Sequence, residues 1–176
     1  EKLNMLFVSS LISKGVDAVG FPPSSFMLCK GGDIEAMFWK QIAEAAKRYV
    51  PVIHGDAVLD LEDIYTILST ERILRELAGH IKPRRVLLAT DGPVMADGEP
   101  VDEIADRNFR DVWSQLGAAE GTDVTGGMRG KVLESALMSA EHGVEVYIFD
   151  GTAPGAIKRA WRFGEGTRVR VSKAPD

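Results

Sequence analysis

Apolar side chains recur along this chain at two different spacings, and the two spacings alternate. A helical spacing of three and four residues runs from Leu3 to Leu11, with Gly15 ending the helix. The same spacing returns in later segments, and near-continuous apolar runs of strand length separate them. The predicted helices cover residues 3 to 15, 34–48, 69–79, 107–116, 131–142 and 153–161, and the predicted strands cover 16–21, 49–56, 85–92, 144–150 and 167–171.

Polar, glycine-containing or proline-containing segments connect these elements. FPPSSF at 21–26 predicts a loop, because two prolines do not fit a central strand, and ADGEP at 96–100 predicts a turn. Residues 59–64 fit either a short excursion or a hairpin. Ser69 is expected to cap the helix that follows it. The alternating residues 167–171 predict an edge strand.

The alternation of strands with helices predicts the fold class. Strands that are apolar throughout are typical of a mainly parallel sheet covered by helices on both faces. We therefore expect an α/β protein, a three-layer αβα sandwich with a mainly parallel open sheet. The expected lobe boundary lies near residue 57, which divides the chain into 1–57 and 58–176.

Composition narrows the classes of partner. The net charge of −5 and the pI of about 5.3 argue against broad contact with nucleic acid or an anionic membrane, but they leave room for a local basic patch. Cys29 is the only cysteine, which excludes an intrachain disulfide and fits a cytoplasmic location. No apolar run reaches the roughly 20 residues that a membrane span needs. The sequence opens with Glu1-Lys2-Leu3-Asn4 and at a predicted helix, so we expect an incomplete start.

Candidate chemistry gathers where the predicted strands end. Three polar turns follow strands, at His54-Gly55-Asp56, Thr90-Asp91-Gly92 and Asp150-Gly151-Thr152, and open parallel sheets bind ligands at such ends. The segment DVTGGMRGKV at 123–132 precedes a predicted helix. Backbone N–H groups of glycines at a helix N-terminus suit a phosphate, and Lys131, placed in the first turn, would neutralise one. An ordinary helix entry explains the same glycines.

Other functional patterns are weaker or absent. His54 follows a buried strand, and His80 and His142 lie near helix C-termini, so we interpret all three as structural. No cluster has zinc-ligand spacing, no G-x-S-x-G motif occurs, and no metal ligand is assigned. The basic cluster from Lys82 to Arg85 is interpreted as a solvated loop, with contact to a nucleotide phosphate as the alternative.

Taken together, the motifs resemble the amino acid kinase superfamily, and within it the archaeal-type isopentenyl phosphate kinases. The similarity runs over nearly the whole chain, and the segment closest to a family signature is DVTGGM. The other segments that carry the resemblance are GVDAVGFPPSSF, PVIHGDAVLD, YTILSTERIL, RVLLATDG, VYIFDGTAPGAIKRA and GEGTRV.

The resemblance implies a function and a set of roles. It implies transfer of the ATP γ-phosphoryl group, with Mg²⁺, to a small phosphate acceptor, isopentenyl phosphate in isoprenoid biosynthesis, by a homodimer. From the charge and the lack of a spanning segment, we expect neither nucleic acid nor membrane among its partners. Residues 1–57 would be the remainder of an N-terminal substrate lobe and 58–176 the nucleotide-binding lobe. By position, Asp91, Gly126, Gly127, Met128 and Lys131 would bind the nucleotide, Gly55 and Asp56 the substrate, and Lys131 and Glu71 would be catalytic.

Two departures from the family pattern leave alternatives open. The family's opening Lys-x-Gly-Gly-Ser strand and its Gly-rich loop with a substrate-binding histidine are not in this sequence, so we expect a fragment or a truncated form. The family's Ser-Gly-Asp is Ser69-Thr70-Glu71 here, and Thr90-Asp91-Gly92 is a shortened nucleotide-loop pattern. The alternatives are a kinase of another phosphate or phosphonate, similar to fosfomycin kinases, and a nucleotide-binding or structural fragment without transferase activity.

Overall fold

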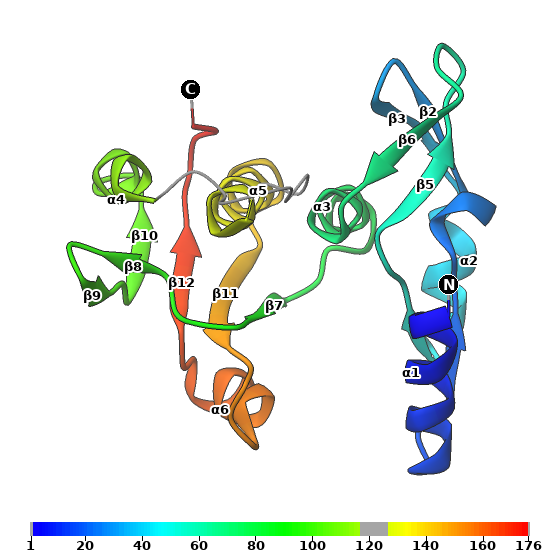
Figure 1. Ribbon diagram of the computed structural model, residues 1–176, viewed down its shortest axis with the longest axis horizontal. Helices are drawn as coiled ribbons and strands as arrows, with labels where there is room; N and C mark the ends of the chain where they lie inside the picture. Colours follow the sequence, from blue (N-terminus) through cyan, green and yellow to red (C-terminus); the bar gives the residue numbers. More distant parts are fainter. Residues whose placement is uncertain (1, 117–126, 176) are drawn as a thin grey trace. The chain divides into compact units, whose positions relative to one another are not determined.

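Backbone contacts divide the chain into two compact units. The computed structural model describes residues 2–116 and 127–175, drawn in Figure 1. Unit 1 comprises residues 1–80 and unit 2 residues 81–176. The division of the chain into a substrate lobe and a nucleotide lobe near residue 57 is a statement about function and stays a prediction.

Unit 1 combines three small two-stranded pairings with helices. Strands β1 and β4 pair in parallel, whereas β2–β3 and β5–β6 are antiparallel hairpins. A core of eight buried residues, among them Phe26, Cys29 and Leu68, joins the hairpins to α2 and α3. The elements are α1 (Lys2–Ser13), β1 (Ala18–Gly20), the 3-10 turn η1 (Pro23–Ser25), β2 (Met27–Lys30), β3 (Asp33–Met37), α2 (Trp39–Ala45), β4 (Val50–Val52), β5 (Asp56–Leu59), β6 (Tyr65–Leu68) and α3 (Thr70–Ile81).

The predicted helix over 34–48 is wrong in its first part. Residues 27–37 form the β2–β3 hairpin, and only Trp39–Ala45 is helical. Gly31 and Gly32 both have positive φ angles, of 57° and 87°, which is the backbone conformation of a two-residue hairpin turn. Ile34 and Met37 stand three residues apart, a spacing that imitates a helix within a strand of five residues.

Unit 2 is built around a four-stranded sheet of order β10-β12-β11-β7. The β7–β11 and β10–β12 pairs are parallel, and β11–β12 is antiparallel. The elements are β7 (Arg85–Thr90), β8 (Met95–Ala96), β9 (Glu99–Pro100), β10 (Glu103–Ala105), α4 (Phe109–Gln115), α5 (Gly127–His142), β11 (Glu145–Asp150), α6 (Ala156–Phe163) and β12 (Thr167–Arg170).

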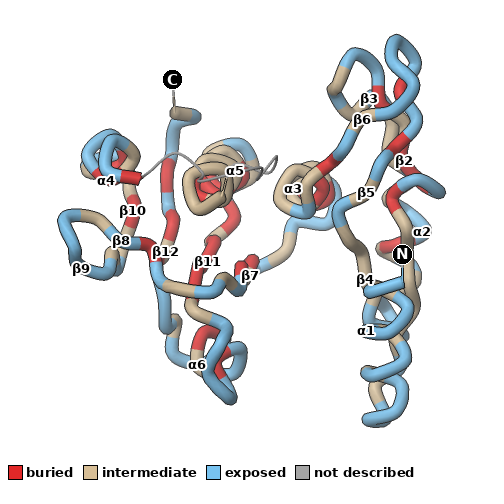
Figure 2. The backbone as a smooth tube through the Cα atoms, in the orientation of Figure 1, coloured by how far each residue is buried: buried red, intermediate tan, exposed pale blue. Residues whose placement is uncertain are grey.

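Helices cover both faces of this sheet at β11. Side chains alternate between the two faces of a strand, and Phe149 clusters with Ala160 of α6. Val146 and Ile148 therefore lie on the opposite face, and α5 packs against β11 and β12. All three of these strand residues are buried, and red buried positions run along β11 in Figure 2. The predicted layering, a helix on each face of a mainly parallel sheet, is confirmed.

The predicted edge strand is wrong, because β12 lies inside the sheet between β10 and β11. Its alternation has another cause: Thr167 and Val169 are buried on one face, whereas Arg168 forms ion pairs with neighbouring strands on the other. Arg168 pairs with Glu145 of β11 and, at 3.9 Å, with Glu103 of β10. The polar positions of β12 thus carry a charged row across the sheet.

Within the residues that the structure describes, no helix is both long enough and apolar enough to cross a bilayer.

Candidate active site

Two of the predicted strand-end turns meet at the carboxyl ends of β7 and β11 in the unit 2 sheet, and we call this end of the sheet the edge. Thr90, the last residue of β7, is in register with Asp150, the last residue of β11. The Thr90 hydroxyl lies 2.6 Å from the carbonyl oxygen of Gly92 and 3.0 Å from that of Phe149, and the Thr90 carbonyl accepts a hydrogen bond from the Gly151 N–H at 2.9 Å. The turn that carries Asp91 is therefore joined to the turn after β11, and Asp91 itself is exposed.

Asp150 organises its own turn. Its Oδ1 accepts hydrogen bonds from the N–H and the hydroxyl of Thr152, at 2.9 and 2.6 Å, and these bonds lower the pKa of the Asp150 carboxyl. A Cβ on Gly151 would lie 2.9 Å from the Ala89 Cβ, so this position has no room for a side chain. The edge therefore presents two short turns, each bearing a carboxylate.

The N-terminus of α5 lies toward the same edge. Near the other end of α5, the Ser139 hydroxyl accepts a hydrogen bond from the Val171 N–H at 3.1 Å. Val171 directly follows β12, which runs antiparallel to β11. The start of α5 at Gly127 is thus directed toward the carboxyl ends of β7 and β11, the arrangement in which a helix dipole favours an anion.

The structure corrects the position of Lys131. The helix begins at Gly127, whose φ of 57° suits glycine, so Lys131 is its fifth residue and lies beyond the first turn. Met128 lies in that first turn, and Gly126 lies outside the described residues. The unpaired backbone N–H groups of the first turn therefore lie at Gly127, Met128 and the residues that follow them, one turn before Lys131. Because helical side chains lean toward the N-terminus, Lys131 keeps the reach to serve the first turn.

Unit 1 places Gly55 beside the start of α3. A Cβ on Gly55 would lie 3.0 Å from the Leu68 carbonyl oxygen and 3.5 Å from the Thr70 nitrogen. Ser69 caps this helix as predicted, because its hydroxyl accepts a hydrogen bond from the Arg72 N–H at 3.2 Å. Glu71 lies in the first turn of α3. The structure therefore brings two sequence-predicted site segments together, the Gly55-Asp56 turn and the Ser69-Thr70-Glu71 helix start.

Asp56 also fixes the proline-containing loop. Its Oδ2 accepts a hydrogen bond from the Ser24 N–H at 3.1 Å, and its Oδ1 accepts one from the Ala57 N–H at 3.0 Å. Burial alone would raise the pKa of the Asp56 carboxyl, but the hydrogen bonds from Ser24 and Ala57 and the nearby His54 outweigh it and lower that pKa. Asp56 is an ionised anchor between the loop and β5.

Asp60 is a structural centre that the sequence did not reveal. It is buried and accepts hydrogen bonds from the N–H groups of Gly31, Gly32 and Glu62, each at 2.9 Å, from the Asp63 N–H at 3.2 Å, and from the Thr66 hydroxyl at 2.6 Å. The Thr66 hydroxyl, together with the backbone donors, holds the pKa of Asp60 well below its usual range. In the sequence, Asp60 fits an ordinary polar residue of a hairpin, so nothing there indicates that it is a buried hydrogen-bonding centre.

Arg72 connects the same hairpin turn to α3. Its guanidinium donates to the Gly32 carbonyl at 3.1 Å and to the Asp33 carboxylate at 3.0 Å. The β2–β3 turn is thus held from one side by Asp60 and from the other by the first turn of the helix that carries Glu71.

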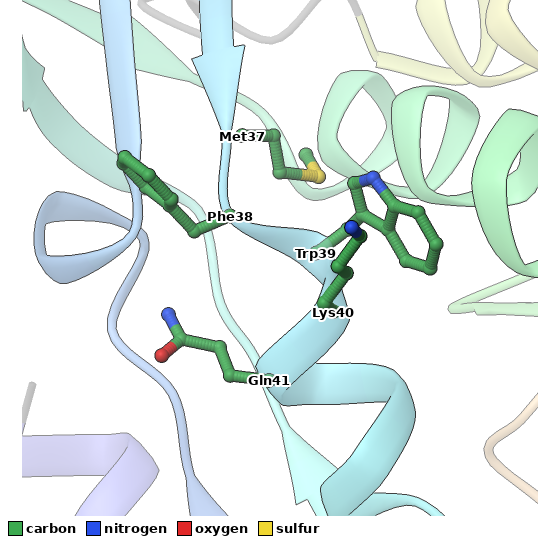
Figure 3. A pocket seen from close by; sticks show the side chains of 5 residues that line it. All are labelled: Met37, Phe38, Trp39, Lys40 and Gln41. Atoms are coloured by element: carbon green, nitrogen blue, oxygen red, sulfur yellow. The ribbon is translucent and has the colours of Figure 1, made fainter.

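A separate pocket opens where β3 passes into α2. Its volume is about 420 Å³ and it is lined by the consecutive residues Met37, Phe38, Trp39, Lys40 and Gln41. Figure 3 shows Met37, Trp39 and Lys40 on one side of the backbone and Phe38 and Gln41 on the other. None of the predicted site residues lines this pocket.

In residues 2–116 and 127–175, no group of three or more His, Cys, Asp or Glu side chains could hold a metal ion. Mg²⁺ that arrives with a nucleotide keeps several waters and takes few protein carboxylates. Asp91 and Asp150, at the edge described above, offer carboxylate oxygens of the kind this ion prefers, so these residues fit such a role.

Comparison with known proteins gives a family match across most of the chain. Residues 2–150 match the model of the amino acid kinase family. The isopentenyl phosphate kinase of Methanothermobacter thermautotrophicus is 33% identical over 180 residues, covering 96% of this chain and 67% of the relative. The isopentenyl phosphate kinase of Methanocaldococcus jannaschii is also 33% identical, covering 98% of this chain and 65% of the relative. The chain thus spans about two thirds of the length of these relatives.

Solved structures agree with the family match. An X-ray structure of an isopentenyl phosphate kinase superposes with a TM-score of 0.71 at 30% identity, covering 96% of this chain and 65% of that one. Aspartokinase III of E. coli, in complex with aspartate and ADP, superposes with a TM-score of 0.67 at 18% identity, which supports the fold alone.

Proposed function

Because this chain belongs to the amino acid kinase family, we propose that its protein transfers the γ-phosphoryl group of ATP to a small phosphomonoester, isopentenyl phosphate. An oxygen of the acceptor phosphate would attack the γ-phosphorus. The bond from that phosphorus to the β–γ bridging oxygen would break, leaving ADP, and the new P–O–P linkage would make isopentenyl diphosphate. Such a transfer depends mainly on positioning and charge stabilisation.

The observation that carries the proposal is the edge where the β7 and β11 turns meet, toward which α5 begins. The first N–H groups of α5, at Gly127 and Met128, would bind phosphate oxygens, and Lys131 would stabilise the charge on the transferring group. Asp91 would lie at the nucleotide, and Mg²⁺ bound with ATP would neutralise phosphate charge.

The acceptor side is supported by an exposed apolar face in unit 1. In the β5–β6 hairpin, Leu59 is paired with Tyr65, and both side chains are about 60% exposed, as is that of Ile67. The strand that carries Tyr65 and Ile67 leads into the start of α3, where Gly55 and Glu71 lie. Asp56 and Gly55 would thus border the acceptor phosphate, with the apolar face beside it for a hydrocarbon group. This combination favours isopentenyl phosphate over an acceptor that is polar throughout.

The proposal extends to assembly and location. Helix α1 has no buried residue, and Leu3, Leu6 and Phe7 are each more than half exposed, which supports a homodimer formed through this helix. Light scattering during gel filtration tests it, and a monomer would exclude it. A single buried free cysteine and the use of ATP support a cytoplasmic location.

The test is an ADP-release assay on the full-length protein with ATP, Mg²⁺ and isopentenyl phosphate, run beside acetylglutamate and fosfomycin as acceptors. Lys131→Ala is expected to lower kcat on the order of 10²–10³-fold and to change the acceptor KM little, because the lysine acts on the transferring group. Lys14→Ala, an exposed lysine in unit 1, is the matched control and should leave kcat unchanged.

Each other outcome has a definite meaning. Faster turnover of fosfomycin or acetylglutamate would show that one of these, and not isopentenyl phosphate, is the acceptor. ATP binding without turnover of any acceptor would show that the protein binds nucleotide but is not a kinase of these acceptors. A Lys131→Ala enzyme with wild-type kcat would refute the role of Lys131 while leaving the activity in place.

A further inference from the structure

The outer side of α6 exposes large apolar side chains. The helix packs on the sheet through Ala156 and Ala160, which are 2% and 0% exposed. Ile157 and Trp161, four residues apart and therefore on one stripe of the helix, are 66% and 54% exposed. Phe163, the last residue of the helix, is 79% exposed. Figure 2 shows exposed positions along α6 and into the turn that follows.

Basic side chains border this apolar stripe. Lys158 and Arg162 directly follow Ile157 and Trp161 in the sequence, are exposed, and form the neighbouring stripe of the helix. Arg85, the first residue of β7, donates a hydrogen bond to the Trp161 carbonyl oxygen at 2.8 Å, which places the segment before β7 beside the end of α6. The Arg85 guanidinium also lies 5.8 Å from the centre of the Trp161 ring.

Four cations of this surface have no carboxylate partner among the described residues, whereas Arg85 pairs with Glu145 at 3.6 Å. Lys82 and Arg84 are exposed beside Arg85 and form no ion pair there, and the same holds for Lys158 and Arg162. By contrast, Arg159 of the same helix binds Glu165 at 2.7 Å. The surface is therefore positively charged in a chain whose net charge is −5.

We propose that this α6 surface, defined by Lys82, Arg84, Ile157, Lys158, Trp161, Arg162 and Phe163, docks the protein on an anionic lipid bilayer. A bilayer interface accepts aliphatic and aromatic side chains at the depth of the headgroups while its phosphates and carboxylates attract lysine and arginine. A nucleic acid or an acidic protein would match the charge but would leave Ile157 and Phe163 without an apolar partner. The net charge of the chain is −5, so a membrane of the same sign is expected to favour contact through this basic surface.

The test is flotation of the full-length protein with vesicles of phosphatidylcholine containing about one third phosphatidylserine, compared with phosphatidylcholine alone. Binding is expected to the anionic vesicles, and to weaken when salt is raised from about 0.05 M to about 0.5 M. Lys158→Glu with Arg162→Glu should weaken it by roughly 30-fold or more, since each basic residue near such a surface contributes roughly fivefold.

The control for charge is Lys14→Glu with Arg48→Glu, which makes the same change at exposed positions of unit 1 and should leave binding as it was. Ile157→Ser tests the apolar stripe separately and, being exposed, is expected to preserve the circular dichroism spectrum and the unfolding midpoint. Its control is Phe38→Ala, at a side chain that is 67% exposed elsewhere.

Three results would overturn the proposal. One is absence of binding to anionic vesicles at low salt. Another is equal loss of binding in the control pair and the α6 pair. The third is binding to RNA or polyglutamate as tight as to the vesicles, with Ile157→Ser having no effect, which would assign the surface to a polyanion.

Discussion

Gly166, in the turn before β12, is expected to tolerate no side chain. Its φ is +117°, a region that is essentially restricted to glycine and costs other residues roughly 1–3 kcal/mol. An added Cβ would lie 2.5 Å from the Ile148 carbonyl oxygen, 2.6 Å from the Phe149 Cβ and 3.0 Å from the Phe149 Cα. Two of these atoms belong to the backbone of β11, an interior strand of the unit 2 sheet, so the clash is not relieved by turning a side chain.

The expected cost of Gly166→Ala follows from these two terms. Overpacking against fixed atoms costs roughly 1–3 kcal/mol. Together, the overpacking and the backbone strain should lower the free energy of unfolding of unit 2 by about 4 kcal/mol. This is a large fraction of the roughly 5–15 kcal/mol of an ordinary domain. For a unit of this size the melting temperature should fall by roughly 15 to 30 °C.

Gly143→Ala separates the strain from the clash. Gly143, which follows α5, has a φ of +67°, and no atom lies within 4 Å of its added Cβ. Only the left-handed backbone is penalised there, by roughly 1–2 kcal/mol. Urea unfolding of both variants, followed by far-UV circular dichroism, measures the difference. Equal losses in the two variants would show that the β11 backbone moves away freely, and the reasoning would be refuted.

Two further predictions concern unit 1. Asp60→Asn should lower the urea midpoint of unit 1 at pH 7 and flatten the dependence of that midpoint on acid. The lowered pKa of the Asp60 carboxyl stabilises the fold above the ordinary carboxyl pKa of roughly 4, and this contribution is lost as the pH falls through the folded-state value. An unchanged pH profile in urea titrations would contradict this prediction. Glu71→Gln, which keeps the side-chain length and removes the charge, should lower kcat on the order of 10²-fold in the ADP-release assay with little change in melting temperature, and a parallel loss of stability would instead assign Glu71 to the fold.

The parts of the fold that follow from local chemistry were predictable. Ser69 was expected to cap α3, and its hydroxyl does so, since a cap depends only on residues within one turn. Polar turns were expected after the strands that end at Thr90 and Asp150, and the structure places these two strand ends in register. The mainly parallel sheet with helices on both faces follows from the same alternation.

The parts that depend on distant partners were not predictable. β12 looks like an edge strand until Arg168 is seen to pair with Glu145 and Glu103 on both neighbours. Asp60 looks like a turn residue until the Gly31 and Gly32 N–H groups reach it from a hairpin nearly thirty residues earlier. In both cases a charged side chain that the sequence assigns to solvent is paired with residues far along the chain, within the protein for Asp60 and at the partly exposed sheet face for Arg168.

These distant contacts bear on the role that we propose for Glu71. The start of α3 is held by the Ser69 cap, by the close approach of Gly55, and by the two hydrogen bonds from Arg72 to the β2–β3 turn. Asp60 fixes that turn from the other side. With the helix start anchored on several sides, a shift of the backbone cannot compensate for the length of a side chain. In the proposed catalytic role of Glu71, its extra methylene relative to the aspartate of the family pattern would therefore be absorbed by the glutamate rotamer or by the position of the acceptor phosphate.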